Sequence, residues 1–248
     1  MNVIRWMVVS AVVIAVGVAG SVNAGTLDAV KQKGYVNAGV SGKVVGFSAP
    51  DAKGVWAGID VDFIRAVAAA IFDDPAKTRF TPVAFKESFT ALQSGEIDIL
   101  ARNTTWTFSR DVDLKFEFVG VNYYDGQGFM VPKELGVSSA KELDGSTVCI
   151  QTGTTTELNL ADFFRSNNIS YEPVPIETGA EAIQQYTAGA CDAYTTDASA
   201  LAAQRANLED PTAHVIMPEI ISKEPLGPLV RHGDNEWGDI VRWTQSHL

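Results

Sequence analysis

Two short polar segments of this sequence each follow an apolar stretch with the character of a buried strand. Residues 103–105 (Asn-Thr-Thr) come after the mostly apolar residues 97–101, and residues 195–197 (Thr-Thr-Asp) come after a similar run. In α/β proteins the loops at the carboxyl ends of parallel strands carry the ligand contacts. Arg110 lies shortly beyond the first segment, so one segment supplies a guanidinium group and the other a carboxylate.

These charges suit a free amino acid, which carries one negative and one positive group. Arg110 can bind a carboxylate through two parallel hydrogen bonds, and a buried Asp197 carboxylate can bind an ammonium group. A third feature is the segment 153–157 (Gly-Thr-Thr-Thr-Glu), in which Thr154 and Glu157 fit a helix-capping box. Free N–H groups at such a helix start attract anions. Alone, each feature is more commonly a solvated arginine or an ordinary capped helix; together they favour a zwitterion site.

Signatures of other kinds of site do not occur in the sequence. There is no G-x-S-x-G nucleophile elbow and no Walker motif. The Gly-Gln-Gly of residues 126–128 is a fragment of a dinucleotide motif, but Val131 replaces its last glycine. Two cysteines and three scattered histidines offer no zinc-type spacing. We therefore expect no enzyme activity, no cofactor and no metal.

Strands and helices are predicted to alternate along the chain. Residues 36–40 read as a strand, and a helix follows Gly58 with Asp60 as its N-cap. A further helix ends at Gly95, and residues 97–101 read as the next buried strand. Alternating β and α elements favour parallel sheets covered by helices.

An internal repeat suggests two related lobes. Residues 92–99 (LQSGEIDI) are echoed by residues 186–193 (YTAGACDA): in both, a helix ends at glycine and an aspartate three residues later opens a strand. The offset, from 98 to 192, is 94 residues, and it places Asn103 onto Asp197. The alternative is chance, since helix–Gly–strand joints are common in α/β proteins. We expect an α/β fold of two lobes, each a mostly parallel sheet flanked by helices.

Charge and composition limit the class of partner. The chain has 248 residues, with 30 acidic and 19 basic side chains and a net charge of −11. An acidic surface without a basic patch repels phosphate backbones, so no nucleic-acid partner is expected. The composition is 46% hydrophobic and 20% charged, which is typical of a globular protein.

The first residues resemble a secretory signal peptide. Arg5 precedes an apolar run at 6–18, and the small-residue ending at 22–24 leads to Gly25 as the expected mature start. The run is shorter than the roughly 20 apolar residues that span a membrane. The sequence therefore predicts an exported protein with a cleaved signal peptide.

The two cysteines, Cys149 and Cys191, both fall in the expected mature chain. In an oxidising compartment an even number of cysteines suggests one disulfide, and two buried thiols are the alternative. We expect the bridge, because both cysteines lie on strands predicted to be neighbours in the second lobe.

Several segments together resemble the family 3 extracellular solute-binding proteins, the polar amino-acid receptors of bacterial ABC importers. The resemblance starts at residues 58–63 (GIDVDF) and covers nearly the whole mature chain. It is carried by residues 58–71, 91–95, 103–110, 153–155 and 196–197. The stretches most similar to the general L-amino-acid-binding branch are residues 102–107, 120–129 and 218–228.

The resemblance implies a two-lobed, type II periplasmic-binding-protein-like clamp with a two-strand hinge. Such a clamp closes on one L-amino acid, here expected to be polar and of broad range. It then docks, as a periplasmic monomer, on an ABC permease at the inner membrane. The glycine- and proline-rich segments 126–132 and 225–230 suit the two hinge crossings.

The resemblance also implies roles for individual residues. Arg110 would bind the α-carboxylate, helped by Thr105 and by the start of the following capped helix at Thr154 and Thr155. Asp197 would bind the α-ammonium group.

Two further roles follow from the same resemblance. Asn103 would offer its main-chain carbonyl to the ammonium group, and Phe47 would place an aromatic ring against the ligand side chain. The loop at 43–46 departs from the usual pattern, which leaves selectivity open.

The expected boundaries divide the chain into three parts. They are residues 1–24 as the signal peptide, 25–131 as the first lobe with 226–248 returning to it, and 132–225 as the second lobe. Because family members continue beyond this point, the sequence resembles a truncated one. Apolar surface on Ile64, Val67 and Ile71 is then expected to lose cover. An exported dehydratase-like enzyme on the same fold and a sensor ectodomain remain alternatives to the transport receptor.

Overall fold

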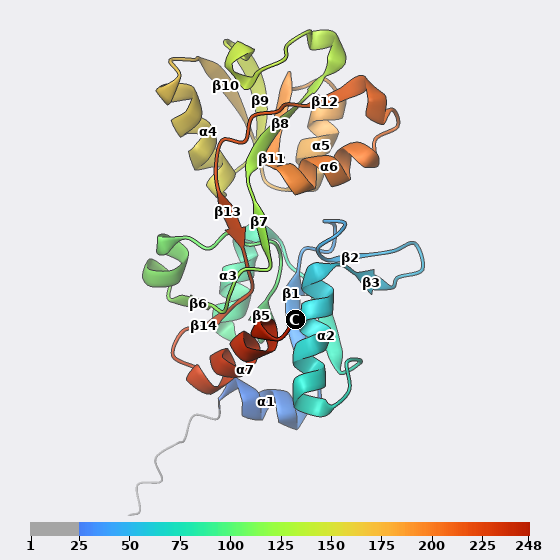
Figure 1. Ribbon diagram of the computed structural model, residues 1–248, viewed down its shortest axis with the longest axis vertical. Coiled ribbons are helices and arrows are strands. Elements are labelled where there is room, and N and C mark those ends of the chain that lie inside the picture. The colour runs from blue at the N-terminus through green and yellow to red at the C-terminus, as the bar shows by residue number, and fades with distance from the viewer. Residues whose placement is uncertain (1–24) are drawn as a thin grey trace, which may run out of the picture.

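A computed structural model describes residues 25–248, so the predicted signal peptide lies outside the described residues. The chain forms two α/β lobes that lie one above the other along the long axis, joined by two extended segments (Figure 1). Over the described part, none of the helices is long and apolar enough to cross a membrane. The predicted two-lobed α/β architecture is confirmed.

The first lobe is built on a five-stranded sheet with the order β4-β1-β5-β14-β6. β4, β1 and β5 are parallel, and β14 runs antiparallel to both β5 and β6. Its sheet strands are β1 (Val36–Val40), β4 (Thr78–Pro82), β5 (Ile99–Leu100), β6 (Phe116–Phe118) and β14 (Leu229–Arg231). Its other elements are α1 (Thr26–Lys33), the ribbon β2 (Ala49–Pro50) and β3 (Trp56–Ala57), α2 (Ile59–Phe72), α3 (Phe85–Ser94), the π-helical turn η1 (Ser109–Asp113) and α7 (Asn235–Ser246).

The second lobe repeats this plan in its sheet, with the order β10-β9-β11-β8-β12. Three strands are again parallel, and β8 is antiparallel to both of its neighbours. Its strands are β8 (Gln127–Pro132), β9 (Ser146–Gln151), β10 (Tyr171–Ile176), β11 (Ala193–Asp197) and β12 (His214–Ile216). Its helices are α4 (Thr155–Ser166), α5 (Gly179–Thr187) and α6 (Ala198–Ala206), with short turns η2 (Lys133–Leu135), η3 (Ala140–Glu142) and η4 (Pro211–Ala213).

The internal repeat is visible at the level of single hydrogen bonds. The Asp98 carboxylate accepts a hydrogen bond from the Asn37 backbone N–H at 2.7 Å. Its counterpart Asp192 accepts one from the Thr147 backbone N–H at 2.8 Å. In each lobe the glycine three residues earlier has a left-handed φ, +80° and +76°, which an L side chain rarely adopts. The repeat is therefore structural and not a chance recurrence.

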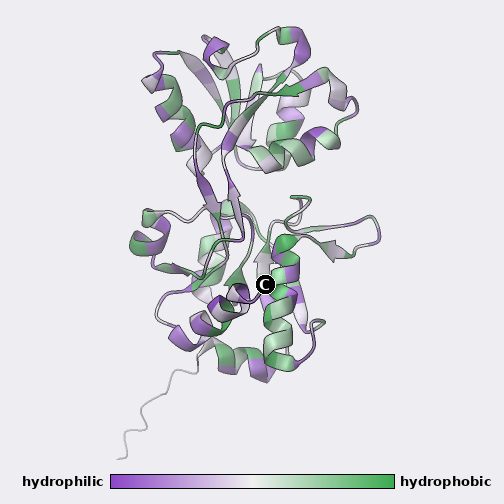
Figure 2. Cartoon of the chain, in the orientation of Figure 1, coloured by the Kyte–Doolittle hydropathy of each residue, from purple (hydrophilic) through white to green (hydrophobic). Residues whose placement is uncertain are grey.

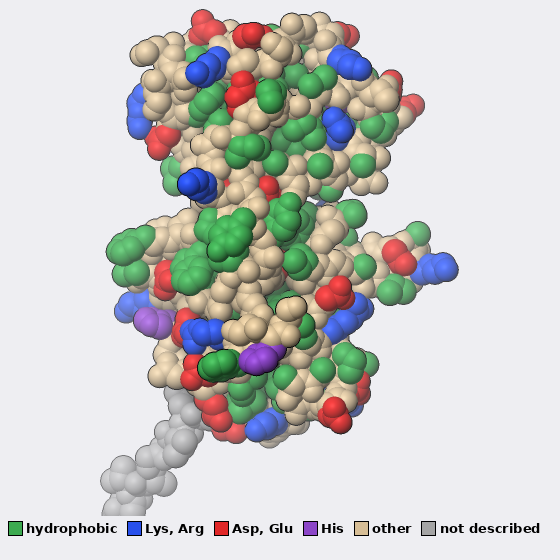
Figure 3. Space-filling view, in the orientation of Figure 1, with side chains coloured by type: hydrophobic (Ala, Val, Ile, Leu, Met, Phe, Trp, Pro, Cys, Tyr) green, Lys and Arg blue, Asp and Glu red, His purple; other side chains and the backbone are tan. Residues whose placement is uncertain are grey.

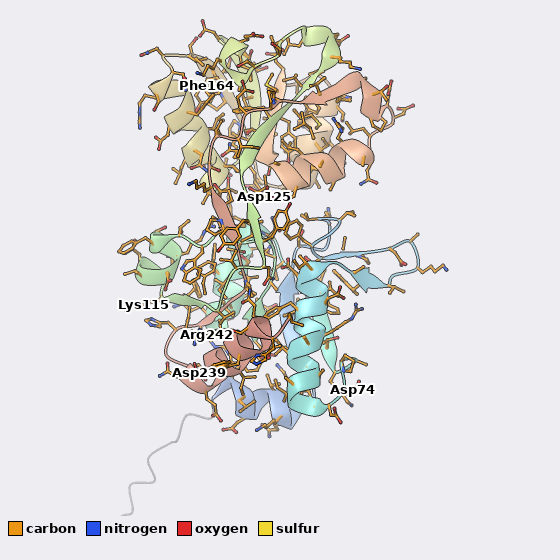
Figure 4. All side chains as sticks on the ribbon, viewed as in Figure 1. Asp74, Lys115, Asp125, Phe164, Asp239 and Arg242 are labelled. Carbon is orange, nitrogen blue, oxygen red and sulfur yellow. A yellow bond between two sulfur atoms is a disulfide. The ribbon has the colours of Figure 1, made fainter. Side chains whose placement is uncertain are left out.

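The lobes are joined by β7 (Tyr123–Asp125) and β13 (Glu224–Leu226), which pair with each other in antiparallel fashion. Asp125, labelled in Figure 4, lies where β7 meets the second lobe. The next strand, residues 127–132, belongs to the second sheet, because it pairs with β11 and β12. The expected boundary after residue 131 is therefore a few residues too late.

Helix α2 begins differently from its prediction. Gly58 is the N-cap and Asp60 lies in the first turn, where its side chain caps no helix N–H. Instead, the buried Asp60 carboxylate accepts hydrogen bonds from the Asn103 backbone N–H at 3.1 Å and from Asn122 Nδ2 at 3.2 Å. The carboxylate thus ties α2 to the loop that follows β5.

Helix α7 closes the core of the first lobe. Trp237 is fully buried and donates its indole N–H to the Asp98 carbonyl at 3.0 Å. The apolar, mostly green α2 of Figure 2 packs beside α7, and its Ile64 and Val67 are fully buried. The expected loss of cover is therefore wrong for Ile64 and Val67, whereas Ile71 is only partly buried. On its outer side, Arg242 of α7 pairs with Asp239 at 2.8 Å (both labelled in Figure 4).

Candidate functional site

The two lobes enclose a cleft of about 600 Å³. Five of the predicted site residues line it: Asn103, Arg110, Thr154, Thr155 and Asp197. They come from the loop after β5, from η1, from the start of α4 and from the end of β11. Both sheets therefore present the carboxyl ends of parallel strands to one cleft, as the sequence predicted.

Arg110 lies on η1 and is almost completely buried. Its Nη1 donates a hydrogen bond to the Thr105 carbonyl at 2.8 Å. The guanidinium carbon lies 5.1 Å from the centre of the Phe85 ring and 5.6 Å from that of Phe89. Burial lowers the pKa of Arg110 to about 10, against the opposing effect of nearby carboxylates. The group therefore stays charged at neutral pH, with hydrogen-bond donors left for a ligand.

Asp197 ends β11 and is 7% exposed, in the wall opposite Arg110. Burial raises its pKa to about 8, and the charges of Asp125 and Glu224 add to that rise. A hydrogen bond from Asn103 and the charge of Arg110 act in the opposite direction. Because the carboxylate form is costly here without a cation, this position favours a ligand that supplies one.

The start of α4 has the predicted capping interactions. Thr154 Oγ1 accepts a hydrogen bond from the Glu157 N–H at 3.3 Å, and Glu157 Oε2 accepts one from the Gly153 N–H at 2.8 Å. The first turn of this helix, including Thr155 and Thr156, lines the cleft. The positive end of the helix dipole is thus available to an anionic group.

Thr105 does not line the cleft in this arrangement, because its hydroxyl faces the hinge. Thr105 Oγ1 donates to Glu224 Oε2 at 2.7 Å, and Thr155 Oγ1 donates to the same oxygen at 3.0 Å. Asn159 Nδ2 and Ser222 Oγ donate to the other oxygen, at 2.7 and 2.6 Å. The buried Glu224 thereby links both lobes, a role that the sequence analysis missed.

Phe47 is also outside the cleft lining. It is 5% exposed and packs edge-to-face against Tyr123, with ring centres 5.5 Å apart. The aromatic residues that line the cleft are Phe85, at the start of α3, and Tyr194 of β11. The sequence analysis missed Phe85, because a phenylalanine at the start of a helix carries no local sign that it lines a cleft.

Arg102 is a second arginine in the cleft wall that the sequence analysis left out. Its guanidinium carbon lies 5.2 Å from the centre of the Phe85 ring. Burial lowers its pKa to about 10, and the Asp60 carboxylate opposes that shift. Directly after it, Asn103 has a left-handed φ of +46° and is held there by its hydrogen bond to Asp60.

Cys149 of β9 and Cys191, just before β11, form a disulfide with their Cα atoms 5.6 Å apart. Both residues are buried in the second lobe. The bridge joins two adjacent parallel strands whose far ends carry cleft residues. It therefore fixes the second wall of the cleft.

Residues 36–246 match the sequence model of the family described as "bacterial extracellular solute-binding proteins, family 3". The chain belongs to this family. This solute-binding protein is 61% identical to the glutamate/glutamine/aspartate/asparagine-binding protein BztA of Rhodobacter capsulatus, over 94% of this chain and 69% of that one. It is 59% identical to the general L-amino acid-binding periplasmic protein AapJ of Rhizobium johnstonii, over 97% of this chain and 70% of the relative.

A solved structure gives the same result for the fold. The ABC transporter periplasmic binding protein from Brucella ovis, with glutathione bound, superposes with a TM-score of 0.86 at 56% identity. The match covers 89% of this chain and 70% of that one. The predicted family and the type II two-lobed fold are confirmed.

Proposed function

We propose that this solute-binding protein captures a free L-amino acid between its lobes and delivers it to the permease of an ABC importer. The observation that carries the proposal is the pair of buried ionisable residues in one cleft, the basic Arg110 from the first lobe and the acidic Asp197 from the second. The names of the relatives from Rhodobacter capsulatus and Rhizobium johnstonii, both amino-acid-binding proteins, support it.

In this proposal each charge of the zwitterion meets a fixed partner. Arg110 binds the α-carboxylate, with the start of α4 at Thr154 and Thr155 on the opposite wall. Asp197 binds the α-ammonium group together with Asn103. Because the two main partners belong to different lobes, a ligand that contacts both stabilises the closed arrangement more than the open one. Closure also removes the charges from water, so each partner becomes necessary.

The test is a calorimetric titration of the protein and its variants with all twenty L-amino acids. Losing one partner of a buried charge pair costs about 2–5 kcal/mol, which is roughly thirtyfold to several thousandfold in affinity. We expect this loss for Arg110→Ala and for Asp197→Ala. Arg165→Ala is a matched control, since Arg165 pairs with Asp162 on the exposed side of α4.

Melting curves of each variant establish that it is folded. An amino-acid methyl ester distinguishes the roles of the two residues: it should bind the parent poorly and lose little more on Arg110→Ala. If folded Arg110→Ala binds amino acids within about threefold of the parent, the carboxylate assignment fails.

The proposal includes binding without turnover, in the periplasm, by a monomer whose protein partner is the membrane permease. Mass spectrometry of the ligand after long incubation would detect a dehydratase-like reaction as a change in mass. Unchanged ligand, together with stimulation of the reconstituted transporter's ATPase by the loaded protein, is the expected result. Stimulation of a signalling partner in place of a transporter would favour a sensor.

A further inference from the structure

Arg102 brings a second cation to the cleft that the zwitterion does not use. The residue lines the cleft, and its Nε is buried with no hydrogen-bond partner among the described residues. The adjacent carboxylate, Asp60, accepts its hydrogen bonds from Asn103 and Asn122. Arg102 is partly buried, and its buried Nε–H is costly to leave unpaired unless an acceptor arrives from elsewhere.

The two cleft arginines flank one aromatic ring. Their guanidinium carbons lie 5.2 Å (Arg102) and 5.1 Å (Arg110) from the centre of Phe85, so they are no more than about 10 Å apart. Carboxylates separated by a few carbon atoms can reach both groups. Lys43, exposed on the cleft wall, adds a further positive charge on the same lobe.

The Asp60 carboxylate offsets the charge of Arg102, but its hydrogen bonds come from two asparagines, so it does not use the guanidinium donors. The α-carboxylate and the α-ammonium group neutralise Arg110 and Asp197, which leaves Arg102 and Lys43 without an anion from the ligand. An extra carboxylate on the ligand supplies it, through charge-assisted hydrogen bonds to the planar guanidinium group.

We propose that Arg102 is a specificity-determining residue that binds a second carboxylate of the ligand. The preferred ligands are then acidic amino acids, or conjugates in which a glutamyl group carries the second carboxylate further away. This inference rests on the proposed function, because it assigns the remaining part of the same ligand. It deepens that function from amino acids in general to dicarboxylates.

The experiment compares four ligands, L-glutamate, L-glutamine, L-alanine and glutathione, on the parent and on Arg102→Met. Methionine keeps an unbranched chain against Phe85 and removes the charge. A hydrogen bond to a charged group is worth enough to predict a loss of about ten- to a hundredfold for L-glutamate. The L-alanine affinity should change by less than about threefold. Arg102→Lys should recover part of the L-glutamate affinity, because it restores the charge without the planar fork.

Arg79→Met is the matched control, since Arg79 is an exposed arginine on β4 that does not line the cleft. A larger loss for glutathione than for L-glutamate also supports the proposal and assigns the second carboxylate to a conjugate. If Arg102→Met weakens L-alanine as much as the two acidic ligands, or leaves all four unchanged, the role of Arg102 is overturned. If the parent protein binds none of the four ligands, the proposed function is overturned together with the role of Arg102. If Arg102→Met weakens the binding of all four ligands equally, only the role of Arg102 fails, and the assignments of Arg110 and Asp197 stand.

Discussion

At the residue scale, the role proposed for Asp197 predicts that ligand binding depends on pH. Burial raises its pKa to about 8, so the carboxyl group is largely protonated in the ligand-free protein at neutral pH. An ammonium group binds the ionised form, and binding below pH 8 must therefore release a proton. Affinity should rise as the pH increases towards 8, because less free energy is spent on removing that proton.

We predict that affinity increases about ten- to twentyfold between pH 6.5 and pH 8, while the ligand's ammonium group remains protonated. Calorimetry in two buffers of different ionisation enthalpy measures the proton release directly. Asp197→Asn should bind more weakly and show little pH dependence over this range. A flat profile in the parent protein would contradict the assignment of Asp197 to the ammonium group.

The cleft residues that the sequence predicted best are those whose position is indicated by residues nearby in the sequence. Asp197 follows a repeat that aligns it with Asn103, and Thr154 has its capping partner three residues away. Arg102 and Phe85 gave no comparable signal, because their importance depends on burial by elements distant in sequence. The local sequence around a single arginine or phenylalanine does not distinguish an exposed position from one in a cleft.

At the element scale, the hinge strand β13 carries one carboxylate that holds both lobes. Glu224 is 2% exposed and accepts four hydrogen bonds, which come from the first lobe, the second lobe and the hinge itself. Glu224→Ala leaves those donors without their acceptor in a buried site, which we expect to lower the free energy of unfolding by about 2–4 kcal/mol.

Thermal melting of Glu224→Ala and Glu224→Gln tests this role. The glutamine variant keeps one acceptor oxygen, so its destabilisation should be smaller. Glu172→Ala, at an exposed position on β10, is the control. A change of less than about 0.5 kcal/mol in Glu224→Ala would show that the hinge does not depend on this carboxylate.

At the element scale, we also expect the disulfide to stabilise the folded protein. Cys149 and Cys191 are separated by 42 residues, and closing a loop of that size stabilises a folded protein by about 3–4 kcal/mol in the chain-entropy description. Reduction should therefore lower the melting temperature. Thiol titration of the unfolded, unreduced protein should find no free thiols, and the finding of two would refute the bridge.

Element boundaries were less predictable than the elements themselves. Strand β1 has the predicted bounds, residues 36–40, because Gly34 and Gly42, both with a left-handed φ, lie close to its two ends. The predicted strand at 97–101 shortens to β5, Ile99–Leu100, next to β14 from the far end of the chain. Arg110, expected only to follow the segment 103–105, lies on a π-helical turn. Such details depend on partners that local patterns do not contain.

At the scale of the whole molecule, ligand binding should stabilise both lobes together. At a ligand concentration of 100 times Kd, binding adds about 2.7 kcal/mol. For a protein of this size we expect the melting temperature to rise by about 5–10 °C. Small-angle scattering should show a smaller radius of gyration with ligand. Arg110→Ala at the same ligand concentration is the control, and an equal rise in that variant would contradict closure on the zwitterion.

Exposed hydrophobic side chains lie near the hinge on the face drawn in Figure 3. Figure 3 shows hydrophobic side chains gathered on the first lobe beside the strands that join the lobes. The exposed apolar residues of that region are Trp106, Phe108, Val112, Leu114 and Tyr124. Four of them, at positions 106, 108, 112 and 114, lie on the segment that carries Arg110. The ligand affinity of a variant at these positions should therefore be measured before any effect on docking is inferred.

The position of β14 sets the order in which the molecule can be completed during synthesis. This strand lies inside the first sheet, between β5 and β6, but it follows the entire second lobe in the chain. A polypeptide that emerges N-terminus first cannot close its first lobe until the second has been made. The second lobe, in contrast, is one continuous segment. The half of the protein that is made first is therefore the half that folds last.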